Sequence, residues 1–189
     1  MHEPLQQTLI DAANFLDVEQ VPYALIGGMA VSLRAQPRMT ADVDMVIGAD
    51  IPRALNLARA LDGTKFKPLF QGMEEVVQKA FILPLRHRET SVKVDLALGM
   101  SGFEIQAIAR ANRLPVGGVS IAVATPEDLL IMKVLAGRPQ DDQDVQGLLL
   151  AHGKKFDWQH CLRVAAELGQ ALGQDLETRI EAFRAKSGN

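Results

Sequence analysis

The segment Tyr23-Ala-Leu-Ile-Gly-Gly-Met-Ala-Val-Ser-Leu-Arg-Ala-Gln-Pro-Arg-Met-Thr-Ala-Asp-Val-Asp-Met-Val-Ile47 decides the fold of this chain. Its first apolar run, residues 23–26, predicts a short buried strand that ends at a pair of glycines. Residues 29–35 predict a helix, and residues 42–47 predict a second strand that opens with two acids. The segment therefore predicts a strand, a glycine turn, a helix and a return strand.

Two features of this unit predict a phosphate site. Gly27 and Gly28 at a strand-to-helix turn let backbone N–H groups approach a phosphate, and the helix N-terminus favours negative charge. Asp42 and Asp44 project from the same side of a strand because side chains alternate, so they can hold a Mg²⁺ that also binds phosphate oxygens. Taken singly, the glycines are also an ordinary turn and the acids a solvated edge. Together they predict phosphoryl or nucleotidyl transfer.

A third carboxylate appears in a later apolar run, residues 91–98. Asp95 shares a strand face with Lys93 and Ala97, opposite to the apolar residues between them. It is either a solvated strand position or a third metal ligand, which could also act as the base for an attacking hydroxyl. Under the second interpretation we expect Asp42, Asp44 and Asp95 to lie on one sheet face.

The rest of the chain predicts an α/β (α+β) protein with a mixed sheet followed by helices. An amphipathic N-terminal helix covers residues 4–16, and a hairpin pairs residues 81–85 with residues 91–98. At Thr125-Pro126 the sequence changes, because a threonine cap, a proline and two acids mark a strong helix start. We therefore expect a catalytic core in residues 1–124 and a helical part in residues 125–189.

Composition limits the function classes. The chain has 189 residues, a net charge of −3 and a pI near 5.8, so it has no general basic field for nucleic acid. The single cysteine, Cys161, excludes an internal disulfide and indicates a reducing compartment, for which the cytoplasm is the expectation. No apolar run reaches the ~20 residues of a membrane span.

The order Gly-Gly, Arg38-x-Thr40-x-Asp42-Val-Asp44 and then a lone Asp95 resembles the nucleotidyltransferases of the DNA polymerase β superfamily. A fourth part, Lys133-x-x-x-Ala-x-Arg138 followed by Asp141-x-x-Asp144, is similar to the AbiEii-type toxin nucleotidyltransferases. The resemblance covers roughly residues 20–150. It implies a Mg²⁺-dependent (or Mn²⁺-dependent) enzyme that takes an NTP and modifies a hydroxyl on an RNA end, a protein or a small molecule. It also implies an antitoxin as a possible partner.

The resemblance also assigns roles to residues. It implies that Asp42, Asp44 and Asp95 are the catalytic and metal-binding residues. Substrate would be bound by the following residues: Gly27, Gly28, Ser32, Arg38, Thr40 and Lys133. Arg138, Asp141 and Asp144 would support this region. The chain departs from the family at Met29, where a serine or threonine is common, so phosphate contact would rest on backbone N–H groups and Ser32.

Other interpretations stay open at this level. Arg38 could pair with Asp42 or Asp44, Lys133 could extend its ammonium to solvent along an apolar helix, and Arg138, Asp141 and Asp144 could form a structural ion-pair network. A phosphohydrolase with an aspartyl nucleophile is disfavoured because the acid pair opens its strand rather than closing it. An inactive nucleotide-binding or partner-binding module, such as half of a toxin–antitoxin pair, remains the rival.

Overall fold

The computed structural model describes residues 2–186 and divides the chain into two compact units. The sheet unit contains residues 1–29 and 39–124, and the helical unit contains residues 30–38 and 125–189. Thus the change at Thr125 coincides with a unit boundary, while a short internal segment of the first part belongs with the C-terminal helices. Residues 187–189 of the expected helical part lie outside the described residues.

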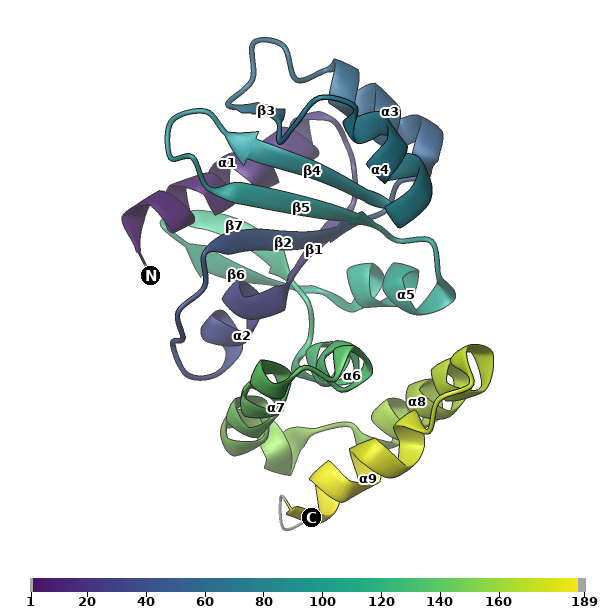
Figure 1. Ribbon diagram of the computed structural model, residues 1–189. Helices are drawn as coiled ribbons and strands as arrows, with labels where there is room; N and C mark the ends of the chain where they lie inside the picture. The colour runs from purple at the N-terminus through teal and green to yellow at the C-terminus, as the bar shows by residue number, and fades with distance from the viewer. Residues whose placement is uncertain (1, 187–189) are drawn as a thin grey trace. The chain divides into compact units, whose positions relative to one another are not determined.

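A seven-stranded mixed sheet forms the centre of the sheet unit, with strand order β3-β4-β5-β2-β1-β7-β6 (Figure 1). The strands are β1 (Tyr23–Ile26), β2 (Asp42–Ile47), β3 (Phe66–Pro68), β4 (Ile82–His87), β5 (Lys93–Leu98), β6 (Asn112–Val116) and β7 (Val119–Val123). β2 runs parallel to β5 and antiparallel to β1, while β4 pairs antiparallel with β5. This topology places the acid pair of β2 directly beside the strand that carries Asp95.

Both units contain helices. The sheet unit carries α1 (Glu3–Val18), α3 (Ile51–Arg59), α4 (Met73–Ala80) and α5 (Gly102–Arg110). Helix α2 (Gly27–Arg34) begins in the sheet unit and continues in the helical unit. The helical unit adds α6 (Pro126–Ala136), α7 (Pro139–His152), the 3₁₀ turn Gly153–Lys155, α8 (Trp158–Leu172) and α9 (Leu176–Lys186). Among residues 2–186, none of the helices combines the length and apolar character that crossing a membrane requires.

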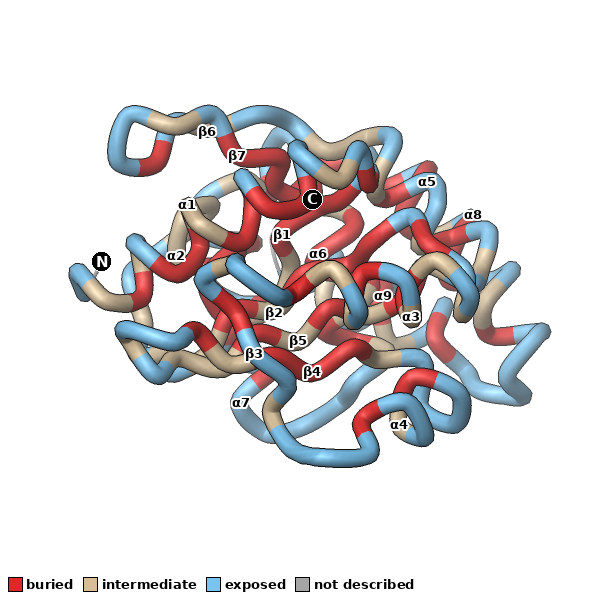
Figure 2. The backbone as a smooth tube through the Cα atoms, turned by 90° about the horizontal axis from the view of Figure 1, so that it is seen from above, coloured by how far each residue is buried: buried red, intermediate tan, exposed pale blue. Residues whose placement is uncertain are grey.

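Burial alternates along β5 and along the first half of β2, the two central strands that carry the acids (Figure 2). The last three residues of β2 are all buried. In β2 and β5, Val43, Met45, Val94 and Leu96 are fully or almost fully buried, whereas the acids between them are half-buried. Helix α1 packs against β2 and β7, and its side chains contact the hairpin residues on the buried side. One sheet face is therefore the core face, and the other carries the polar residues.

The mixed α/β class is confirmed, and so are the helix near the N-terminus, the strands at residues 23–26 and 42–47 and the hairpin of β4 with β5. Thr125 caps α6 by accepting a hydrogen bond from the Asp128 backbone N–H, as its position before a proline predicts. Strands β3 and β6 were not expected. They contain Pro68 and Pro115 and lie at the two edges of the sheet, where a missing N–H is tolerated.

Candidate active site

Three aspartates lie on one face of the central sheet. Asp44 in β2 and Asp95 in β5 are direct partners in the parallel register, and Asp42 is the partner of Lys93. Residues paired in register point to the same side, and residues two apart on a strand do so as well. Asp42, Asp44 and Asp95 therefore share a face, together with Lys93, and we call these four residues the face cluster. This is the arrangement expected if Asp95 acts with the acid pair.

Gly27 closes one side of the face cluster. It follows Ile26, which pairs with Asp44 in the antiparallel register of β1 and β2. Its φ of +67° lies in the left-handed region, and a Cβ placed there would stand 2.2 Å from Asp44 Oδ2. Glycine is thus required for both backbone conformation and space. The turn brings main chain against the Asp44 carboxylate.

Lys93 supplies the positive charge within the face cluster. Its Nζ donates a hydrogen bond to Asp95 Oδ2 at 2.5 Å. This hydrogen bond raises the pKa of Lys93, partial burial opposes the rise, and the negative charges of Asp95, Asp42 and Asp44 add to it. The field at this ammonium shows that all three carboxylates act on one place, where a cation is stabilised.

The donor set fits a hard divalent cation. Carboxylate oxygens are the ligands Mg²⁺ prefers, and Asp95 Oδ1 is buried with no hydrogen-bond partner. The side chains do not already form a ligand cage: in residues 2–186 no group of three or more His, Cys, Asp or Glu is placed to hold a metal ion as it lies. Lys93 Nζ contacts Asp95 Oδ2, so Oδ1 is the Asp95 oxygen left for a metal.

The other substrate-binding candidates of the sheet unit lie at the two ends of the motif. Thr40 donates a hydrogen bond to Asp42 Oδ1 at 3.3 Å, which orients that carboxylate as β2 begins. Gly28 is buried in the first turn of α2, directly after Gly27. Thr40 therefore acts on the face cluster through Asp42 rather than standing apart from it.

Ser32 and Arg38 belong to the helical unit. The Ser32 hydroxyl accepts a hydrogen bond from the Arg38 backbone N–H at 3.3 Å, which braces the segment after α2. Arg38 Nε lies 2.9 Å from Asp144 Oδ1 in α7. This ion pair joins Arg38 to the second aspartate of the C-terminal motif, a partner that the sequence did not suggest for it.

Lys133 and its neighbours form a buried ion-pair network in the helical unit. Lys133 is 5% exposed, and its Nζ lies 2.9 Å from Asp141 Oδ1 and 2.7 Å from Asp144 Oδ2. Arg138 donates to Asp141 from its backbone N–H and its guanidinium. We call the five residues Arg38, Lys133, Arg138, Asp141 and Asp144 the buried cluster, after the enclosed side chains of Lys133, Asp141 and Asp144; the Arg138 side chain at its edge is 60% exposed. The proposal that Lys133 extends to solvent is wrong, because the side chain is enclosed by its partners.

Asp141 shows how strongly the buried cluster favours ionised carboxylates. Its side chain is fully buried, and burial alone would raise its pKa. The hydrogen bonds from Arg138 and Lys133, together with the Lys133 charge, outweigh that effect and lower the pKa of Asp141 to about 2. The network joins α6, α7 and the segment after α2 within the helical unit.

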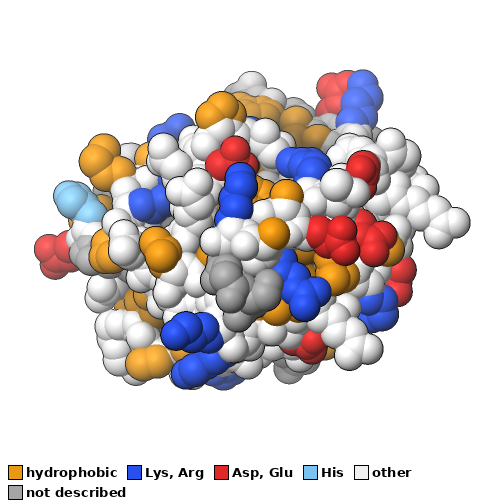
Figure 3. Space-filling view, turned by 90° about the horizontal axis from the view of Figure 1, so that it is seen from below, with side chains coloured by type: hydrophobic (Ala, Val, Ile, Leu, Met, Phe, Trp, Pro, Cys, Tyr) orange, Lys and Arg blue, Asp and Glu red, His pale blue; other side chains and the backbone are white. Residues whose placement is uncertain are grey.

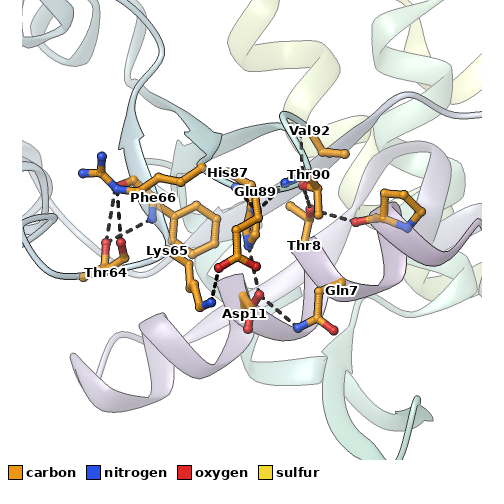
Figure 4. Close-up of polar contacts among 12 residues, drawn as sticks. Gln7, Thr8, Asp11, Thr64, Lys65, Phe66, His87, Glu89, Thr90 and Val92 are labelled. Atoms are coloured by element: carbon orange, nitrogen blue, oxygen red, sulfur yellow. Dashed lines mark hydrogen bonds and ion pairs between the residues drawn. The ribbon is translucent and has the colours of Figure 1, made fainter.

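A second polar group of the sheet unit surrounds His87, which the sequence did not single out (Figure 4). It lies on the sheet face opposite to the face cluster. His87 is fully buried, and its Nε2 lies 2.9 Å from Asp11 Oδ2 in α1. Its Nδ1 accepts hydrogen bonds from the Glu89 and Thr90 backbone N–H groups. Because His87 alternates with Arg86 along β4, it faces the core side rather than the face cluster. Nε2 thus joins the hairpin to α1, and Nδ1 fixes the turn between β4 and β5, so both ring nitrogens serve structural contacts.

The family comparison covers nearly the whole chain. Residues 6–185 match the model of a family described as a nucleotidyltransferase of unknown function (DUF6036). No curated protein matches the chain in sequence. The family match includes the face cluster, the glycine turn and the buried cluster within its bounds.

Solved structures agree on the fold. An antigenic nucleotidyltransferase-like protein from Paracoccidioides brasiliensis superposes with a TM-score of 0.56 at 23% identity, covering 95% of this chain and 93% of that one. ANT(2″)-Ia in complex with adenylyl-2″-tobramycin gives 0.53 at 13% identity, with 96% and 97% covered. The Megavirus polyadenylate synthase gives 0.51 at 12% identity, covering 80% of this chain and 32% of that chain.

The family match and the shared fold support the same assignment. The broader resemblance inferred from the sequence is confirmed, since both comparisons report nucleotidyltransferases. An enzyme of the transferase class follows from it. The chain belongs to this family of nucleotidyltransferases.

Proposed function

We propose that this protein is a Mg²⁺-dependent nucleotidyltransferase that moves a nucleoside monophosphate from an NTP to an acceptor hydroxyl. The observation that carries the proposal is the register that sets Asp44 beside Asp95 on one sheet face, with Asp42 two residues away. The close approach of Gly27 to Asp44 supports it, because triphosphate and metal ligands then meet at one place. The family supports the class of reaction.

Within this proposal each residue has a role. Asp42 and Asp44 hold Mg²⁺ (or Mn²⁺), and Asp95 completes the set. When bound, the metal neutralises phosphate charge and stabilises the charge that develops during transfer. Gly27 and Gly28 present backbone N–H groups to the triphosphate. Thr40 keeps Asp42 oriented through the hydrogen bond described above.

The transfer balances as a displacement at the α-phosphorus. The acceptor oxygen forms a bond to that phosphorus, and the bond from phosphorus to the oxygen bridging the α- and β-phosphates breaks. Pyrophosphate leaves with the bonding electron pair. Asp95 accepts the hydroxyl proton, which its half-buried position and its unpaired Oδ1 permit.

For the helical unit we propose a positioning role. Ser32 and Arg38 fix the segment after α2, and Lys133 joins it to α7 through Asp144. The finer resemblance to AbiEii-type toxin nucleotidyltransferases, for which an antitoxin would be the partner, rests on Lys133, Arg138, Asp141 and Asp144. An NTP-dependent reaction also suits the cytoplasm, the compartment expected from the sequence.

The fold neighbours include both kinds of acceptor. One is the complex with adenylyl-2″-tobramycin, a modified small molecule, and another is a polyadenylate synthase. The test therefore includes all three classes of acceptor: RNA, protein and small molecules. The protein is incubated with each α-labelled NTP, Mg²⁺ or Mn²⁺, and either total RNA, protein or small-molecule extract. We expect label to enter one fraction, with pyrophosphate released in equal amount.

The control is Asp44→Asn, which keeps shape and removes charge. Loss of about 3 kcal/mol of transition-state stabilisation would reduce transfer on the order of 10²–10³-fold. Because Asp44 is half-buried on the sheet face, cooperative melting should persist. NTP binding without any transfer by the unmodified protein would contradict the proposal and favour an inactive nucleotide-binding module.

A further inference from the structure

Resting on the proposed function, we propose that the acceptor is the end of a single-stranded RNA whose last phosphates are held by Lys67 and Arg86. These residues lie in register with the face cluster. Lys67 in β3 is the partner of Arg86 in β4, Arg86 is the partner of Lys93 in β5, and Lys93 is the partner of Asp42 in β2. These four residues form one row across four adjacent strands. The row contains three cations, Lys67, Arg86 and Lys93, and ends at Asp42 of the face cluster.

Three like charges side by side are unfavourable unless an anion joins them. Lys93 is balanced by Asp95, but the other two cations are not balanced in this way. Arg86 Nη1 donates to the Ser91 carbonyl oxygen, and Lys67 is exposed. Within the part of the chain that the structure describes, neither of them forms an ion pair. The row therefore has excess positive charge at its outer end.

A cavity lies at this outer end. It measures about 540 Å³ and is lined by Lys67, Phe70, Gln71, Glu74 and Arg86 among others. Phe70 is 46% exposed, which gives a base an aromatic surface to stack on. Glu74 lies in the first turn of α4, where a carboxylate complements the helix dipole, so we assign phosphate to the β3–β4 side.

The spacing suits a chain rather than a single phosphate. Neighbouring strands lie about 4.8 Å apart, which puts Arg86 roughly 10 Å and Lys67 roughly 14 Å from the Asp42 position across the sheet. The last phosphates of an extended strand can occupy such a line while the terminal hydroxyl lies at Asp95. A second, apolar cavity of about 460 Å³ lined by Phe81, Ile82 and Met100 would instead suit a small-molecule acceptor.

The register also distinguishes Arg86 from other arginines of the chain. Arg86 lies on the face of the carboxylates, whereas Arg38 pairs with Asp144 and Arg88 donates to the Thr64 carbonyl oxygen. Figure 3 shows acidic and basic side chains interspersed over one face of the molecule. With a net charge of −3, RNA binding would depend on this local row rather than on a general field.

The test is direct binding of a short fluorescein-labelled single-stranded RNA with a free terminal hydroxyl, followed by anisotropy across a salt series without NTP. We expect Lys67→Gln and Arg86→Gln each to weaken binding about tenfold at low salt. Each should also lower the slope of log affinity against log salt by about 0.7. Arg59→Gln removes an equal charge from α3, where Arg59 contacts Asn56, and should change neither value.

Unchanged RNA affinity in Lys67→Gln and Arg86→Gln, or no RNA binding at low salt, would overturn the inference. The proposed function fails differently. Transfer to another acceptor that depends on Asp44 would leave the proposed function standing while removing RNA as the acceptor. RNA bound through the row with no transfer of label would overturn the proposed function and with it the acceptor role of that RNA.

Discussion

The face cluster and the buried cluster put aspartates under opposite conditions. In the buried cluster, Asp141 and Asp144 are 0% and 3% exposed and meet three cations from three segments of the helical unit. In the face cluster, three half-buried aspartates act together on Lys93. In the buried cluster, the carboxylates are balanced by cations of the protein itself. In the face cluster, the aspartates outnumber the lysine, so their negative charge can bind an added cation.

The difference follows from the cost of burying charge. A carboxylate removed from water is stable only when it is paired and hydrogen-bonded. The helical unit satisfies this requirement with its own side chains. On the sheet face the carboxylates are only half-buried, so solvent lowers the cost and three of them can lie close together around one lysine. Balanced acids thus indicate structure, and acids gathered in excess indicate a ligand.

The largest expected effect comes from removing the lysine of the buried cluster. Lys133→Met leaves Asp141 and Asp144 without the ammonium that lies between them. Breaking a buried pair in this way costs about 3–5 kcal/mol. Burial of Lys133 between these two carboxylates is the reason for so large an effect. Urea unfolding measures the effect, and a change below about 1 kcal/mol would contradict a structural role.

Gly27→Ala should come next. An alanine there must adopt a left-handed φ and places its Cβ against the Asp44 carboxylate, which together cost about 2–4 kcal/mol. The matched control is Gly118→Ala in the β6–β7 turn, where φ is +83° but nothing lies within 4 Å. It should lose only about 1–2 kcal/mol. We expect transfer activity to fall in the Gly27 variant alone, and equal activity in both would contradict the close-approach role.

The lowered pKa of Asp141 predicts a pH-dependent contribution to stability of about 2 kcal/mol. Asp141 has its pKa lowered from 3.8 to about 2 in the folded protein. A depressed pKa contributes stability that is complete above the unfolded value and is lost as pH falls through the folded value. The contribution should therefore disappear between pH of about 4 and about 2. Unfolding of the wild type and Asp141→Asn across this range measures it. A stability difference independent of pH would argue against the ion pairs.

Lys93→Met should have the smallest effect on folding. Lys93 and Asp95 form a pair on an accessible face, with side chains 40% and 21% exposed, and such pairs contribute about 0–1 kcal/mol. Thermal melting measures it beside Lys133→Met. Losses of equal size in the two variants would show that the clusters do not differ in the way proposed.

The face cluster could be predicted in part from local pattern. Alternation along β2 and β5 places Asp42 and Asp44 together and sets Asp95 apart from its apolar neighbours. The register that makes Asp44 and Asp95 partners depends on pairing between distant strands, and a shift by one residue would reverse the face. The glycine turn was predictable because left-handed backbone at a strand end favours glycine.

The buried cluster was less accessible to sequence reasoning. The motif showed Lys133, Asp141 and Asp144, but the partner Arg38 comes from a segment far away in the chain. Only tertiary packing of the helical unit brings it to α7. Lys67 was also missed, because β3 is a three-residue edge strand that includes Pro68 and carries little pattern. Local sequence patterns thus identified many of the site residues, whereas their interaction partners depended on packing between segments far apart in the chain.

Mn²⁺ binding tests the central claim most directly, because it asks whether the excess acids of the face cluster take up a cation. Calorimetric titration compares wild type, Asp44→Asn and Asp95→Asn with Asp142→Asn, an exposed change in α7 beside the buried cluster. We predict that Mn²⁺ binding, with or without NTP, is lost in the two face-cluster variants and retained in Asp142→Asn. Wild-type protein that binds no Mn²⁺ even with NTP present, or an Asp44→Asn variant that binds it equally well, would contradict the account.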